Sequence, residues 1–139
     1  MQAQQSIRLI LEETITAHGW LIPEVVVEYT SRLLSERIDR NPWQPEPSYA
    51  ERYLSIKKPC EALELGDTCW FTRAVFPELG SRRGINSSYY VQLGQGCYSM
   101  ALQYARYPAV QLLHDHFEFL AEVTYTAIRH HGEFRSMWD

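Results

Sequence analysis

The amino-acid sequence predicts an all-α protein, a single domain built as a bundle of five or six helices. The chain has 139 residues, which is close to the commonest length of one domain. Hydrophobic residues make up 45% and charged residues 22%, as is usual for a protein with one packed core. Apolar residues recur at helical spacing through most of the chain, with breaks at glycine and proline. We therefore expect residues 1–139 to form one helical domain.

The first two helices are predicted from apolar stripes with recognisable ends. Ser6 can cap a helix over residues 6–18, and Gly19 follows it as a stop. Pro23 is a favoured first helical residue, and the apolar pattern behind it continues to about residue 40. The three prolines in residues 41–47 exclude a helix there and predict a short linker.

The middle of the chain is predicted to contain a short helix and a longer one. Ser48 can cap the short helix, which ends before Pro59. The longer helix covers residues 60–76 and stops at Pro77. Residues 79–85 contain two glycines and two arginines, a composition typical of a loop.

Two long helices are predicted in the C-terminal part of the chain. The first covers residues 86–106 and presents a row of small residues, including Gly94 and Ala101, which would let another helix approach closely. The second covers residues 108–131 and has the strongest apolar period of the chain. Because the connection between them is short, these fifth and sixth helices are expected to form an antiparallel hairpin.

Charge and hydropathy argue against several classes of function. The formal net charge of -4 at pH 7 gives no broad positive field, so nucleic acid is not an expected partner. The apolar runs are far shorter than the roughly 20 residues of a membrane span, so no membrane partner is expected. The N-terminal residues have no secretion signal, and a cytoplasmic location follows as the expectation. Cys60, Cys69 and Cys97 lack disulfide or zinc spacing and are expected to be reduced, buried side chains.

A distinctive pattern of glycine and aromatic residues lies between residues 66 and 101. It consists of Gly66-Asp67, Trp70-Phe71, Phe76-Pro77, Arg83-Gly84, Tyr89-Tyr90, Leu93-Gly94 and Tyr98. This order resembles a pattern found in an uncharacterised bacterial family of helical proteins. The resemblance covers about a quarter of the chain and implies the helical fold. Since that family has no assigned activity, the resemblance implies no catalytic residue.

Asp67 is the first candidate site residue, because it falls within the apolar pattern of the helix over residues 60–76. A carboxylate in such a place must be paired or have its pKa raised. Its partner could be a tyrosine hydroxyl or an arginine. We interpret Asp67 as a structural hub for hydrogen bonds, with an acid–base role as the alternative if the pair opens into a pocket.

Arg82, Arg83 and Ser87 form the second candidate site. The two arginines come just before a helix start that is rich in free N–H groups and serine hydroxyls. Such an arrangement attracts anions or the carboxylates of a partner. A solvated loop is the alternative interpretation.

A metal site is the third candidate. His114 and His116 lie two residues apart and would point away from each other on a helix, so they cannot chelate one ion there. His114, Glu118 and Glu122 are spaced four apart and would share one helix face. These three residues are the predicted ligands, with a solvated helix face as the alternative.

The sequence contains no motif for nucleophilic catalysis, phosphoryl transfer or dinucleotide binding, so no catalytic residue and no cofactor are predicted. Aromatic residues at helix ends and in loops are typical of protein interfaces. We therefore expect a non-catalytic intracellular adaptor or regulatory module that acts through protein contacts, as a partner-binding protein or a homodimer. The alternative is a small enzyme or metal-binding protein with a site between the helix over residues 108–131 and the helix over residues 60–76.

Overall fold

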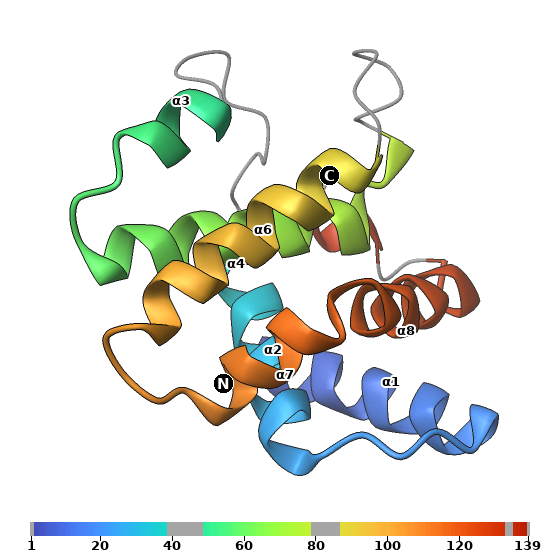
Figure 1. The fold of residues 1–139 in the computed structure, drawn as a ribbon. Coiled ribbons are helices and arrows are strands. Elements are labelled where there is room, and N and C mark those ends of the chain that lie inside the picture. The colour runs from blue at the N-terminus through green and yellow to red at the C-terminus, as the bar shows by residue number, and fades with distance from the viewer. Residues whose placement is uncertain (1, 39–48, 79–86, 133–134, 139) are drawn as a thin grey trace.

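The computed structural model describes residues 2–38, 49–78, 87–132 and 135–138. Within these ranges the regular structure is entirely helical, which confirms the predicted fold class. Helix α8 contacts both α4 and α1, α7 contacts both α6 and α2, and α2 runs behind α7 to contact α4 directly (Figure 1). The described elements are α1 (Gln2–His18), α2 (Glu24–Glu36), α3 (Tyr49–Leu54), α4 (Pro59–Val75), α6 (Ser87–Leu102), α7 (Pro108–Asp115), α8 (Phe117–His130) and a 3₁₀ turn (Arg135–Met137).

Helices α1 and α2 pack against each other at the N-terminal end of the chain. Gly19 ends α1 in the left-handed region, with φ of 67°, a conformation that glycine adopts without strain. Arg8 on α1 forms ion pairs with Glu24 and Glu28 on α2. The predicted stop at Gly19 is therefore confirmed, although α1 begins at Gln2, before the expected cap at Ser6. The expected linker over residues 41–47 lies outside the described residues.

Helices α4 and α6 form the most extensive pair in the structure, and their shared face contains the centre of the core. Pro59 is the first residue of α4, and the Glu61 carboxylate accepts the backbone N–H groups of Lys57 and Lys58 at this end. The two helices come close because Gly66 and Gly94 lack side chains. A Cβ atom on Gly66 would lie 2.7 Å from the Tyr98 ring on α6, and one on Gly94 would lie 3.2 Å from the Cβ of Cys69 on α4 and 2.5 Å from the Phe117 ring on α8.

The single helix predicted over residues 108–131 is wrong, because the chain leaves helical geometry at His116. This residue has φ of -126° and ψ of 38°, and it separates α7 from α8. Phe117 directly follows the bend, is only 1% exposed and fills the space left by Gly94 on α6. The apolar period continues on both sides of the bend, so periodicity alone does not reveal it. With this division the described ranges contain seven α-helices, against the expected five or six.

The helix predicted to end at residue 106 also ends earlier, at Leu102, before the connection to Pro108. Helix α6 contacts α7 across this connection, while α4 is its more extensive partner. None of the helices in the described ranges has the length and the apolar content needed to cross a bilayer.

Candidate functional site

Asp67 lies at the centre of a hydrogen-bonded cluster that joins three helices. The Tyr29 hydroxyl on α2 lies 2.9 Å from each Asp67 carboxylate oxygen, and the Tyr98 hydroxyl on α6 lies 2.8 Å from Oδ1. Burial raises the pKa of Asp67 from its ordinary 3.8 to about 6, although the hydroxyl of Tyr98, the nearby Arg37 and the hydroxyl of Tyr29 oppose this rise. The carboxylate therefore accepts bonds from both neighbouring helices, and its protonation state changes near neutral pH.

Arg37 extends this cluster along α2 and α4. Its side chain is buried, and Nη2 lies 3.0 Å from both Glu64 Oε1 and Thr68 Oγ1. Burial, followed by the Asp67 charge, raises the pKa of the hydroxyls of Tyr29 and Tyr98, so both remain donors. The hydrogen-bond partners of Asp67, which the sequence left open, are thus the hydroxyls of Tyr29 and Tyr98, and Arg37 acts on Asp67 through its charge.

The predicted metal ligands are not brought together. His114 is on α7 and the two glutamates are on α8, because the bend at His116 separates the two helices. Glu122 Oε1 lies 2.7 Å from Arg73 Nη2 on α4, and Glu118 Oε1 lies 3.6 Å from the same atom. In the part of the chain that the structure describes, no three His, Cys, Asp or Glu side chains are grouped to hold a metal ion.

The α8 carboxylates also form a network separate from that of Asp67. Asp67 and Arg73 are six residues apart on α4, so they point to different sides of that helix. Arg73 faces Glu118 and Glu122, whereas Asp67 faces Tyr29 and Tyr98. The site expected between the last predicted helix and α4 is therefore an ion-pair cluster around a buried arginine.

The predicted anion site cannot be placed. Arg82 and Arg83 lie outside the described residues, and so does the side chain of Ser87. Ser87 is the first residue of α6, so the helix start is near its expected position at residue 86.

A cluster that sequence reasoning missed lies where α6 meets the C-terminal end of α7. Ser99 Oγ is 2.9 Å from His114 Nε2, and His114 Nδ1 is 2.9 Å from Asp115 Oδ1. The bond from His114 lowers the pKa of the Asp115 carboxyl. The order of groups is that of a Ser-His-Asp triad. Ser99 and His114 are on different helices, so no local motif indicates that they meet.

A second cluster consists of four aromatic rings along the outer side of α8, which we call the aromatic strip: His18, Trp20, Phe119 and His130. The His18 and Trp20 rings stack with centroids 4.4 Å apart, Trp20 meets Phe119 edge-on at 5.8 Å, and His18 lies 5.9 Å from His130. Phe119 and His130 are eleven residues apart, about three helical turns, so they share a face of α8.

The cysteines differ in environment. Cys69 and Cys97 are buried, as expected, and burial raises the pKa of the Cys97 thiol to about 12. Cys60 is exposed in the first turn of α4, contrary to the expectation of a buried side chain.

Comparison with known proteins adds no assignment to these sites. No family model matches the chain, and neither the curated proteins nor the solved structures contain a match. The geometry of the side chains is therefore the basis for the function proposed below.

Proposed function

We propose that this protein is a non-catalytic intracellular adaptor that binds a protein partner, or a second copy of itself, through the aromatic strip. The observation that carries the proposal is the position of these rings at the surface. His18, Phe119 and His130 are exposed, and Phe119 keeps 45% of its surface accessible. Leu21, which follows Trp20, is 97% exposed. Aromatic residues are enriched at protein interfaces and supply most of their strongest contacts.

A further apolar side chain is exposed at the start of α2. Val25 is the second residue of α2, four residues after Leu21 in the sequence, and is 42% exposed. Exposed apolar patches often mark sites of protein association. A cytoplasmic location fits the proposal, because the three cysteines are free thiols, and thiols persist unpaired in reducing compartments.

The experiment uses a photoreactive benzoyl-phenylalanine at position 119, with the same residue at Tyr104 as the control. Tyr104 lies two residues after the end of α6 and is 68% exposed, so it is at least as accessible as Phe119. We expect a discrete cross-linked product at position 119, either with a second copy in the purified protein or with a partner in cells. This product should be absent at position 104 and lost when Trp20→Ala is added.

Equal products at positions 119 and 104 would overturn the proposal, and so would the absence of any product at position 119. Light scattering after size exclusion distinguishes self-association from binding of a different protein. A mass that increases with concentration in the wild type, but not in Phe119→Ser, identifies the second copy as the partner.

A second candidate function is hydrolysis of an activated ester at Ser99, and the observation that favours it is the Ser99-His114-Asp115 geometry. Ser99 Oγ would attack the ester carbonyl while His114 Nε2 takes the hydroxyl proton and passes it to the leaving alkoxide. Water would then release the acyl group by the same route. This candidate ranks second because Ser99 lies inside α6, where the neighbouring N–H groups are used by the helix and are not available to stabilise an oxyanion.

The test of this second candidate is labelling by a fluorophosphonate probe. Hydrolytic activity predicts labelling of the wild type and of the control Ser35→Ala, but not of Ser99→Ala. Labelling that is absent, or that is the same in all three proteins, contradicts it.

A further inference from the structure

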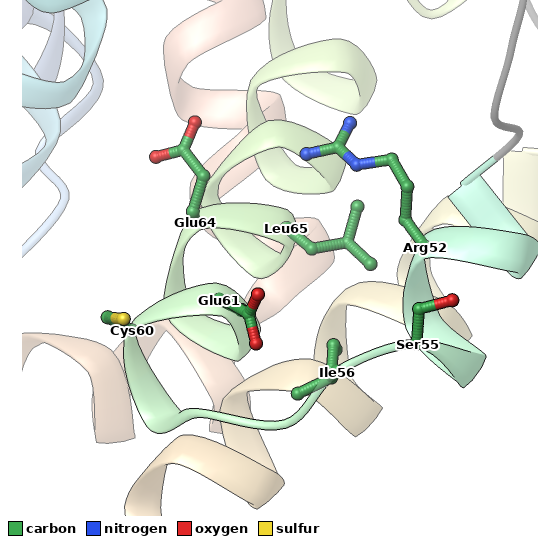
Figure 2. A pocket seen from close by; sticks show the side chains of 7 residues that line it. All are labelled: Arg52, Ser55, Ile56, Cys60, Glu61, Glu64 and Leu65. Carbon is green, nitrogen blue, oxygen red and sulfur yellow. The ribbon is translucent and has the colours of Figure 1, made fainter.

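A cavity lies between α3 and the first turns of α4. None of the residues that line it belongs to the aromatic strip. Its volume is about 340 Å³. Figure 2 shows that Arg52 reaches from α3 over Leu65, while Glu61 and Glu64 come from α4 and Ile56 from the connection between the two helices. Sites for small ligands usually measure about 300–1,000 Å³ and combine an apolar floor with a few placed polar groups. This cavity has both properties.

The charged groups around the cavity are arranged on two walls. The Arg52 guanidinium on α3 lies 5.6 Å from the Tyr49 ring centroid, and within the described ranges it forms no ion pair. On the α4 wall, Glu61 Oε1 accepts two backbone N–H groups, and Glu64 Oε1 accepts the Arg37 guanidinium. The Arg52 cation on α3 and the two α4 carboxylates thus line the cavity from different helices, and the protein already holds both carboxylates in place.

The sum of these charges restricts the ligand. The lining contains one positive charge, on Arg52, and two negative charges, on Glu61 and Glu64. Arg37, which is not part of the lining, pairs with Glu64 and offsets its charge. One positive and one negative charge therefore remain to face a ligand, which favours a ligand that is itself neutral but carries both signs. The apolar floor of Ile56 and Leu65 lies between the two walls and favours an aliphatic body.

We propose that the cavity between α3 and α4 binds a free α-amino acid with an aliphatic side chain. Its carboxylate pairs with Arg52, because guanidinium matches carboxylate in a planar, two-pronged contact. Its ammonium group faces Glu61 and Glu64. Its side chain lies on Ile56 and Leu65. This site is independent of the aromatic strip, so the failure of one proposal leaves the other unaffected.

The experiment follows the methyl signals of Ile56 and Leu65 by NMR while L-leucine is added to the full-length protein. Two further probes separate the charges: 4-methylpentanoate keeps the aliphatic body and the carboxylate, and 3-methylbutylamine keeps the aliphatic body and the ammonium group. We expect saturable shifts with leucine, at a Kd of about 1 mM, because so small a ligand has few contacts. Each of the two single-charge probes should bind at least about tenfold more weakly.

The variants test the same assignment from the side of the protein. Arg52→Gln should weaken leucine binding at least about tenfold, since a hydrogen bond to a charged group is lost. Arg106→Gln, which removes the same charge from an exposed position after α6, is the matched control and should leave binding unchanged. Ser55→Phe fills the cavity without altering a charge and should abolish the shifts.

Three results would overturn the proposal. One is the absence of saturable shifts with leucine in a wild type whose methyl spectrum is that of a folded protein. Another is binding of the amine or the acid as tight as that of leucine, which refutes recognition of both charges. The third is an equal loss in Arg52→Gln and Arg106→Gln, which would show a general effect of charge.

Discussion

Replacing Asp67 with asparagine should change how the stability of the protein depends on pH. The wild-type carboxylate is held by the hydroxyls of Tyr29 and Tyr98, and burial raises its pKa to about 6. Asparagine has nearly the same shape and can still accept a tyrosine O–H, but its amide stays neutral at every pH used. The substitution thus removes the ionisation of this side chain and keeps its place between α2, α4 and α6.

The sign of this pH dependence follows from the direction in which the pKa of Asp67 is shifted. The folded-state pKa of Asp67 is higher than the ordinary value of 3.8, so the folded protein binds this proton more tightly than the unfolded chain does. The contribution to stability is fully present below pH 3.8 and is lost as the pH rises through about 6. The two pKa values correspond to about 3 kcal/mol in total, and about 2 kcal/mol of this is lost between about pH 4.5 and about pH 7.5.

The assay is urea unfolding of both proteins at these two pH values, followed by tryptophan fluorescence. The free energy of unfolding of the wild type minus that of Asp67→Asn should fall by about 2 kcal/mol from the lower to the higher pH. Taking this difference cancels the titration of all other groups. Glu36→Gln, which removes an exposed carboxylate at the end of α2, controls for net charge. A difference that stays constant, or that increases with pH, would refute the reasoning about burial.

Two further predictions concern the packing of α6 against α8 and the buried arginine on α4. Gly94→Ala should lower the free energy of unfolding by about 2 kcal/mol in the urea assay, because its Cβ would lie 2.5 Å from the Phe117 ring. Gly132→Ala is the control and should have little effect, because a Cβ at this position would meet nothing within 4 Å. Glu122→Ala should lower the free energy of unfolding by about 1–2 kcal/mol in the urea assay, because the nearly buried Arg73 loses its closer partner. A loss of stability that disappears in high salt would instead indicate a solvent-screened ion pair.

The sequence was sufficient to predict the helical class and several helix ends, because these depend on local signals. Gly19 ends α1 through its positive φ, and α4 begins at Pro59, one residue before the expected start at Cys60. The expectation that Asp67 needs a partner likewise follows from one residue in an apolar pattern. The choice of Tyr29 and Tyr98 as partners could not be predicted, because they are 38 and 31 residues away and meet Asp67 only after three helices pack.

The bend at His116 and the sites around it depend on contacts between distant parts of the chain. Phe117 can turn inward because Gly94, on another helix, leaves room for its ring. The same packing places Ser99 beside His114 and directs Glu118 and Glu122 toward Arg73. Periodicity along one segment contains no information about these neighbours, so the predicted metal face did not correspond to a shared site.

The pattern of glycine and aromatic residues between residues 66 and 101 has a physical explanation in the α4–α6 interface. Gly66 and Gly94 leave space for the rings of Tyr98 and Phe117, and Asp67 accepts the Tyr98 hydroxyl. Of its aromatic members, Tyr89 is partly buried, and the others are buried in the core: Trp70, Phe71, Phe76, Tyr90 and Tyr98. The aromatic strip and the cavity between α3 and α4 are built from residues outside this pattern. A chain that shares the pattern is therefore expected to share the packing of α4 and α6, while the residues proposed here to bind partner and ligand are free to differ.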